Sequence, residues 1–166
     1  TNSDTIKVSF SAPSSGQQAV AIDRLVVYRS QADQPRISSV VDALSEKLGG
    51  HHVYGTTGST ANYKFRYDDG NPVGPERPYS VLECGPVGTN MNYDEASAAA
   101  INEKGDCDVV LDVQFNVGIS DDHAEAIWFK LGDNERAKTD FMADYKFFHD
   151  YVKELQNSAG GAGPKL

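Results

Sequence analysis

One run of ten residues, 108–117, constrains the fold of this chain more than any other stretch. Apolar residues occupy every second position of the run, at Val109, Leu111, Val113, Phe115 and Val117. The positions between them are mainly polar, at Asp108, Asp112, Gln114 and Asn116. Because successive side chains of a strand point to opposite faces, this alternation predicts a β-strand with one buried face and one wetter face.

The residues after this run predict its hairpin partner. Residues 118–123 are typical of a turn, and residues 124–131 can return as a second strand with Ile127, Phe129 and Leu131 inward. Trp128 and Lys130 would then point outward with the polar face. Acidic residues early in the segment and Lys130 late in it also suit a helix, and we favour the hairpin on the pattern of alternation.

The remaining elements follow from periodicity and from start and stop residues. We expect strands at 5–10, 19–29, 61–67 and 79–84, an Ala-rich helix at 92–104, and a helix that starts near Pro35 and ends at Gly49. A short strand can begin at 51–54, whereas 55–60 is typical of a loop. Asp133 can cap a terminal helix, in which an apolar stripe at Phe141, Tyr145, Phe148, Val152 and Leu155 would pack along the whole length.

These elements predict a single α+β domain over residues 1–157, followed by a flexible Gly-rich tail at 158–166. The order strand, helix, strand, strand, helix, strand over residues 19–117 is that of a ferredoxin-like βαββαβ arrangement. We therefore expect a two-layer sandwich with a mainly antiparallel sheet. An N-terminal strand, the C-terminal hairpin strand and the terminal helix would extend it.

The composition disfavours several classes of partner. The 166 residues include 24 acidic and 15 basic side chains, which gives a formal net charge of -9. Such a charge repels phosphate backbones and anionic lipid surfaces, so we expect no nucleic-acid partner. No apolar run approaches the roughly 20 residues that span a bilayer, so we expect no membrane insertion.

Cys84 and Cys107 are the two cysteines of the chain. They are compatible with one disulfide bond in an oxidising compartment, and equally with two buried thiols. In the expected topology, a helix with a rise of about 1.5 Å per residue separates them, whereas a disulfide bond needs Cα atoms within about 7 Å. Either the bond is absent or the topology of this half differs. The start at Thr1, without an initiator Met or a signal segment, fits a processed mature protein but equally a shortened chain.

No complete catalytic, metal or cofactor motif is present. Asp106, Asp108 and Asp112 share one strand face and could bind a cation through their oxygen atoms, but Lys64 and Arg66 could equally face them and neutralise them. The four histidines lack the spacing of a zinc motif, and no Gly-rich loop carries the residues of a phosphate loop. We therefore predict no metal site and no cofactor.

The candidate binding residues are Trp128, Gln114 and Asn116. A tryptophan on the polar face beside two amides is a plausible anchor for a sugar or a protein, and coverage by the terminal helix is the alternative. Aromatic side chains at Tyr63, Phe65 and Tyr67 could stack RNA bases, but they would also have to build the core.

We therefore favour a non-catalytic binding or interaction module outside the cytoplasm. Its partner would be a protein or a carbohydrate, bound through the proline-rich loop 72–78 and the open sheet face. One alternative is a hydrolytic enzyme that uses Asp108, Asp112 and His123, which leaves enzymatic activity open. Another is a structural subunit of a larger oligomer or assembly, with the tail docked on a neighbour.

Overall fold

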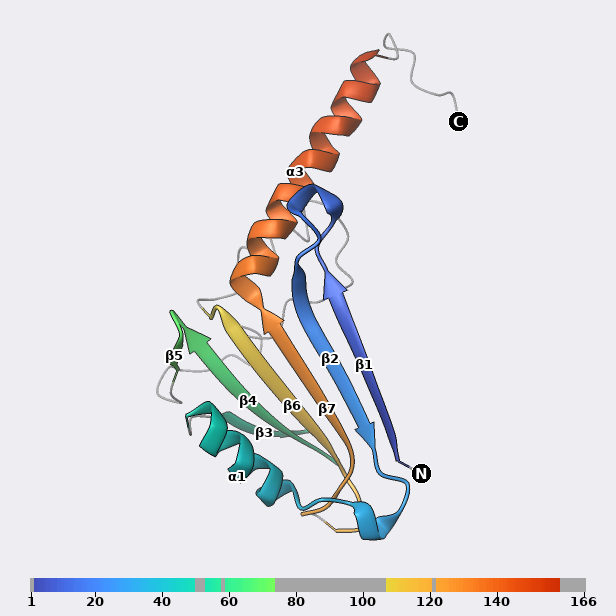
Figure 1. The fold of residues 1–166 in the computed structure, drawn as a ribbon, viewed down its shortest axis with the longest axis vertical. Helices are drawn as coiled ribbons and strands as arrows, with labels where there is room; N and C mark the ends of the chain where they lie inside the picture. Colours follow the sequence, from blue (N-terminus) through green and yellow to red (C-terminus); the bar gives the residue numbers. More distant parts are fainter. Residues whose placement is uncertain (1, 50–52, 58, 74–106, 121, 159–166) are drawn as a thin grey trace.

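The structure, a computed structural model, describes residues 2–49, 53–57, 59–73, 107–120 and 122–158. Its strands are β1 (Ser3–Phe10), β2 (Ala19–Val27), β3 (Val53–Thr57), β4 (Thr60–Asp68), β5 (Asn71–Pro72), β6 (Val109–Val117) and β7 (Ala124–Asp133). Its α-helices are α1 (Ile37–Leu48) and α3 (Asn134–Ser158), and short 3-10 helices lie at Pro13–Ser15 (η1) and Gln31–Asp33 (η2). The fold is α+β, and the described strands form one antiparallel sheet (Figure 1).

The alternating run and its hairpin partner lie near the middle of this sheet. β6 pairs with β7 in antiparallel register, with Val113 opposite Phe129 and Phe115 opposite Ile127. The hairpin prediction is therefore confirmed, and the helical alternative for residues 124–131 is wrong. Val113 and Phe115 are completely buried, as the alternation predicted for the inward face of the strand.

The ferredoxin-like strand order is not confirmed. The order across the sheet is β1-β2-β7-β6-β4-β3, so β7 lies between β2 and β6. In the expected arrangement, the first strand of the βαββαβ unit and its last would instead be neighbours. The hairpin places β7 on β6, and the free edge of β7 then pairs with the apolar strand β2. The expected strand 79–84 and helix 92–104 lie outside the described residues.

The segment 55–60 was predicted as a loop, and this prediction is wrong for Gly55 to Thr57 and for Thr60, which belong to strands, whereas Ser59 lies in a turn. Val53 pairs with Lys64 and Thr57 pairs with Thr60, so β3 continues through Gly55 to Thr57. The backbone groups of β4 supply these hydrogen bonds. Such pairing across a hairpin overrides the weak strand preference of Gly55, and the β-branched Thr56 and Thr57 themselves favour a strand.

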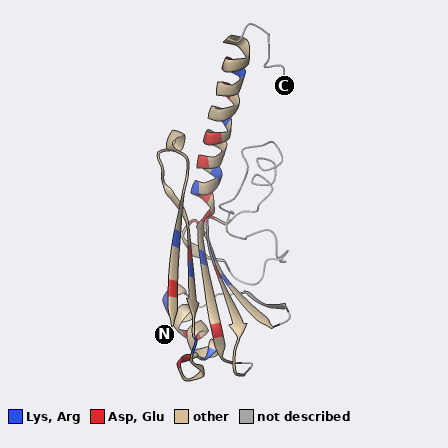
Figure 2. Ribbon diagram, turned by 90° about the vertical axis from the view of Figure 1, so that its right-hand side faces the viewer, with Lys and Arg blue, Asp and Glu red and all other residues tan. Residues whose placement is uncertain are grey.

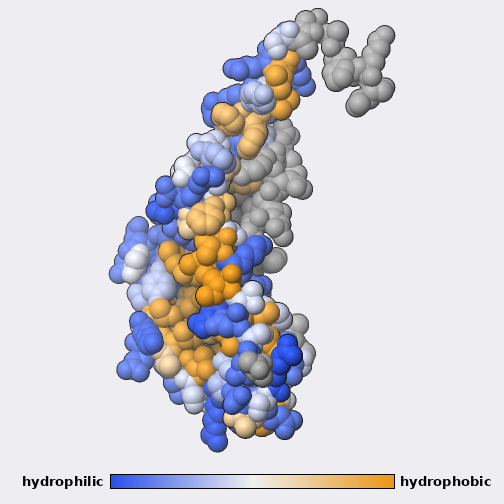
Figure 3. Space-filling model, turned by 45° about the vertical axis from the view of Figure 1, so that its right-hand side comes forward, coloured by the Kyte–Doolittle hydropathy of each residue, from blue (hydrophilic) through white to orange (hydrophobic). Residues whose placement is uncertain are grey.

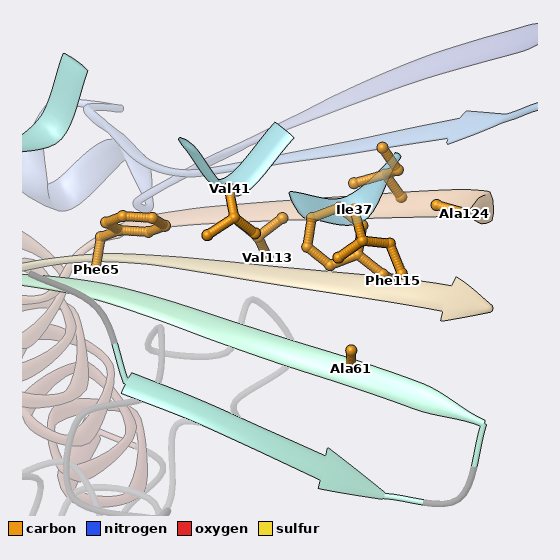
Figure 4. Packing of buried hydrophobic residues seen from close by; sticks show 8 residues of the cluster. Ile37, Val41, Ala61, Phe65, Val113, Phe115 and Ala124 are labelled. Carbon is orange, nitrogen blue, oxygen red and sulfur yellow. The ribbon is translucent and has the colours of Figure 1, made fainter. Parts of the chain in front are cut away.

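Helix α1 covers one face of the sheet over β4, β6 and part of β7. Ile37 and Val41 point from the helix onto Phe65, Val113 and Phe115 (Figure 4). The helix ends at Gly49, as predicted, because this residue adopts a left-handed conformation with φ of 89°. It begins at Ile37, later than predicted.

The start of α1 is set by the turn between β6 and β7. The carboxylate of Asp122 accepts hydrogen bonds from the backbone N–H and the hydroxyl of Ser38, each at 3.1 Å. The backbone N–H of Ile37 donates to the Asp122 carbonyl at 2.8 Å. Asp33, expected just before the helix, instead ends the short helix η2.

Helix α3 begins directly after β7 and runs beyond the end of the sheet (Figure 1). Asp133 caps it as predicted, since its carboxylate accepts a hydrogen bond from the Arg136 N–H at 3.0 Å. The stripe packs in the first half of the helix, where Ala137 and Phe141 are buried against Val20. It does not pack along the whole helix, because the sheet ends before the second half of α3 begins.

A buried carboxylate fixes the first half of α3 to the turn between β1 and β2. Asp144 is 1% exposed and accepts hydrogen bonds from the Ala12 N–H and the Ser15 hydroxyl at 3.0 Å. The hydroxyl of Ser14 donates to its other carboxylate oxygen. This contact determines the direction in which the second half of the helix projects.

Candidate protein-binding surface

Among the described residues, helix α1 covers only one side of the sheet face on which it lies. The register places Phe65, Leu111, Leu131, Ile22 and Val8 in one row across five strands, from β4 to β1. Phe65 lies under α1 and is 0% exposed, whereas Leu131 is 38%, Ile22 39% and Val8 41% exposed. The same row therefore passes from core to surface as it leaves the helix.

The uncovered side of this face forms what we call the sheet patch. It consists of Ile6, Val8 and Phe10 on β1, Ile22 on β2 and Leu131 on β7. Ile6 and Phe10 are each 62% exposed. Figure 3 shows hydrophobic residues gathered over the middle of the molecule and recurring along α3 in the same view. Both apolar surfaces are thus accessible from one side.

The second half of α3 carries what we call the helix stripe. It consists of Phe147, Phe148, Tyr151, Val152 and Leu155, which are between 40% and 53% exposed. Phe148, Val152 and Leu155 continue the spacing of the buried residues Ala137 and Phe141, about two, three and four turns beyond Phe141. The stripe is therefore the partly exposed continuation of the helix's core-facing side.

The charged residues beside these surfaces neutralise one another. Arg24 donates two hydrogen bonds to Asp4 on the neighbouring strand, at 2.6 and 3.0 Å, and holds the pKa of that carboxyl below its usual value. On α3, Lys146 lies 2.7 Å from Asp150. In Figure 2, the positions of basic and acidic residues are interspersed along α3 and the strands. The apolar surface is therefore not enclosed by charge of one sign.

The predicted binding residues lie on the opposite face of the sheet. Gln114 is directly opposite Trp128 in the register, and Asn116 is opposite Ala126, two positions along the same face. Trp128, Gln114 and Asn116 are all partly exposed. The structure thus brings the three together on one face, as expected from the alternation of β6 and β7.

The next row on that face alternates in charge. Lys64, Asp112, Lys130, Asp23 and Lys7 face one another in turn across five strands. The ammonium of Lys64 lies 3.9 Å from the Asp112 carboxylate. Burial raises the pKa of Asp112, against the opposing charges of Lys64 and Lys130. Lysine side chains therefore balance the charge of Asp112. This arrangement is the alternative to cation binding that the sequence left open for this residue.

Of the other two carboxylates of the cation hypothesis, only that of Asp108 belongs to the described residues. Asp108 accepts a hydrogen bond from the Asp69 N–H at 2.6 Å, and Asp106 lies outside the described residues. Over the described ranges, no three His, Cys, Asp or Glu side chains are placed to hold a metal ion. Among these residues, the geometry therefore offers no cation site.

The three residues suspected of hydrolysis do not meet. Asp108 precedes β6 and His123 follows its far end, so nine strand residues, about 30 Å of extended chain, separate them. A cavity of about 400 Å³ is lined by Asp108 together with Asp68, Cys107, Glu135, Lys138 and Thr139. Asp112 and His123 do not line that cavity.

Cys107 is 3% exposed and packs beside Val110. Cys84 lies outside the described residues, so a bridge between the two cysteines stays a prediction. The Gly-rich tail from Ala159 onward also lies outside them.

Sequence reasoning missed the sheet patch. The alternation of Ile6, Val8 and Phe10 predicted that they share a face. Pairing with Arg24 and Ile22 on β2 confirms this for Ile6 and Val8, whereas Phe10 follows a register shift. The alternation carried no information about whether a helix covers that face. The sequence did offer one signal, the ratio of helices to strands. A single secure helix between residues 19 and 67 is too narrow to cover all the predicted strands.

The chain matches no known protein family, no curated protein and no solved structure. In the part of the chain that the structure describes, no helix has the length and apolarity needed to cross a membrane. The function must therefore be argued from the surface itself.

Proposed function

We propose that this chain is a non-catalytic protein-binding module whose docking surface is the sheet patch together with the helix stripe. The observation that carries the proposal is the exposure of ten large apolar side chains on two surfaces that face the same side of the molecule. Single exposed apolar residues are common on protein surfaces, but contiguous groups mark interaction sites.

The size of the surface favours a protein over a small ligand. Ten residues that each expose about half of roughly 200 Å² present on the order of 1,000 Å². A stable protein interface buries about 800 Å² on each partner, which the two surfaces together can supply. Each surface alone, at about 500 Å², matches the largest apolar patch of a typical monomer, which covers about 300–600 Å² and is often functional. Over the described residues, the sheet patch and the projecting helix stripe are open surfaces that do not surround a small molecule.

The compartment in which the module acts rests on the cysteines. A bond between Cys84 and Cys107 would support action outside the cytoplasm, as the sequence suggested. The proline-rich loop that was expected to contribute to binding lies mostly outside the described residues, so the proposal does not use it.

A photo-crosslinking experiment tests the docking surface. Benzoylphenylalanine replaces Val8 on the sheet patch or Val152 on the helix stripe, in cells that naturally produce the chain. Thr5 on the opposite face of β1 and Asn157 on the opposite side of α3 provide matched control positions. We expect a discrete crosslinked protein adduct from positions 8 and 152 and none from positions 5 and 157.

The outcomes of that experiment separate clearly. An adduct with another protein or with a second copy of the chain supports the proposed function. The absence of any adduct at positions 8 and 152, or equal crosslinking at all four positions, would contradict it.

A carbohydrate partner is the second candidate, and Trp128 beside Gln114 is the observation that favours it. Sugar rings stack on aromatic faces while amides bind their hydroxyl groups. Because Trp128 is the only tryptophan in the chain, its emission reports directly on this face. A saturable change of emission on addition of oligosaccharides would support this candidate, and unchanged emission across a broad panel would remove it.

A further inference from the structure

The sheet patch and the helix stripe are complementary in kind, since one is a sheet surface that could be covered by a helix and the other is a helix surface that could pack on a sheet. Helix α1 has 12 residues, about 18 Å, and covers one side of the sheet. Residues 147–158 of α3 form a helical segment of the same length whose apolar side is exposed. Among the described residues, the strands β1 and β2 and the part of β7 that α1 does not cover are together about 10 Å wide, close to the diameter of one helix.

We infer that two copies of this chain associate face to face, with the helix stripe of each copy packed on the sheet patch of the other. This inference rests on the proposed docking surface and names its partner. Each α3 would then take the place next to α1 that a second helix occupies in a complete layer of helices on a sheet. The two contacts would be identical, as in any dimer with two-fold symmetry.

The orientation of the two surfaces permits this exchange. Because both are accessible from the same side of one copy, a two-fold rotation turns both toward the first copy (Figure 3). The second half of α3 extends beyond its own sheet, so it can reach the sheet of the facing copy (Figure 1). One copy alone cannot make the contact, since its stripe lies past the end of its own strands.

The amount of apolar surface suits a second copy. Stripe and patch together expose on the order of 1,000 Å² per chain, which exceeds the roughly 800 Å² per partner of a stable interface. A coiled-coil dimer through the helix stripes alone would be weaker. Phe148, Val152 and Leu155 span only about one heptad, whereas a stable coiled coil needs three or four.

Electrostatics permits the association at ordinary salt. Each chain has a net charge of -9, which opposes the approach of two copies. At about 0.15 M salt, charges separated by more than roughly 8 Å are screened, and the pairs Asp4–Arg24 and Lys146–Asp150 beside the surfaces are locally neutral. The apolar contact is therefore opposed mainly by distant, screened charge.

Sedimentation equilibrium of two complementary variants tests the exchange. Val8→Lys disrupts the patch and Leu155→Glu disrupts the stripe, and both residues are already 41–50% exposed in one copy, so the fold should tolerate them. Thr5→Lys and Asn157→Glu carry the same charge changes on the opposite sides of the same elements. Circular dichroism before each run verifies that all four variants are folded.

The expected result has three parts. The wild-type chain and both controls sediment at twice the 18.0 kDa mass of one chain at micromolar concentration. Val8→Lys and Leu155→Glu, each alone, dissociate at least tenfold more readily. An equimolar mixture of the two variants regains association, because a mixed dimer keeps one native contact and places Lys against Glu in the other.

Other results would overturn the exchange. A wild-type chain that stays monomeric up to about 100 μM would rule out the second copy as partner, while crosslinks from position 8 to another protein would still support the proposed function. A dimer that Val8→Lys leaves intact, or a mixture that does not regain association, would exclude the reciprocal contact.

Discussion

Replacing Asp144 with alanine should cost the fold about 3 kcal/mol and loosen the base of α3. The carboxylate is 1% exposed and accepts hydrogen bonds from the Ala12 N–H, the Ser14 hydroxyl and the Ser15 hydroxyl. Hydrogen bonds to a charged acceptor contribute about 1.5–3 kcal/mol each, and a buried donor left without a partner costs about 1–3 kcal/mol. Because the two hydroxyls can turn partly toward water, we expect the loss of the N–H contact to dominate.

The assay is urea unfolding followed by two signals. Emission of Trp128 reports on the sheet, and far-ultraviolet circular dichroism reports mainly on the helices. Glu154→Gln, an exposed position on the same helix, is the control and should change the unfolding free energy by less than about 0.5 kcal/mol. A double-mutant cycle with Ser15→Ala should give a coupling energy of about 1 kcal/mol.

The contact also bears on function, because Asp144 sets the direction of the helix stripe. Asp144→Ala should therefore weaken any association that uses the stripe, even though residue 144 does not belong to it. A loss of stability below about 1 kcal/mol, or no coupling to Ser15, would refute the assignment of Asp144 as the anchor of α3.

Three further predictions concern the fold. Phe65→Ala should lower the unfolding free energy by about 3–5 kcal/mol in urea unfolding, because the ring is 0% exposed beneath α1. Hydrogen bonds from Ser38 hold the pKa of Asp122 below its ordinary value of 3.8. The ionised carboxylate therefore stabilises the fold at pH values above 3.8, and this contribution is lost as the pH falls through the lowered pKa. The urea midpoints of wild type and Asp122→Ala should accordingly differ by a constant amount from pH 7 to about 5 and converge below it, whereas a difference that persists in acid would refute the cap. Intact mass without reductant should show a chain lighter by about two hydrogens if Cys84 and Cys107 are bonded, in which case reduction should cost about 3 kcal/mol; two alkylatable thiols would refute the bond.

The elements that the sequence predicted best are those determined by local physics. Alternation specified both faces of β6, and the turn after it specified the hairpin with β7. Gly49 ends α1 and Asp133 caps α3, because a left-handed residue and a carboxylate act on the nearest backbone groups.

The errors share a different cause. The pairing of β7 with β2, and of Gly55 with Asn62, depends on which strand edges remain free after other pairs form. The spacing of Phe148, Val152 and Leu155 was read correctly, but not their exposure. Periodicity specifies the side of a helix that is apolar, whereas the length of the sheet beneath it decides whether that side is covered.

The candidate surface could not be predicted from the sequence, because its exposure also depends on how the other elements are placed. Ile6 and Val8 look like core residues in the sequence, and only the register shows that their row continues past α1. The sequence did bring Trp128 and Gln114 together correctly, because they face each other within one hairpin.

Amide hydrogen exchange tests the docking surface most directly. Residues 147–158 form a helix whose apolar side is exposed, so their amides should exchange rapidly in the isolated chain at nanomolar concentration. In the assembled state, recovered from its source or at high concentration, we predict strong protection of these amides and of β1. Exchange at the same rate in both states would contradict a binding role for this surface.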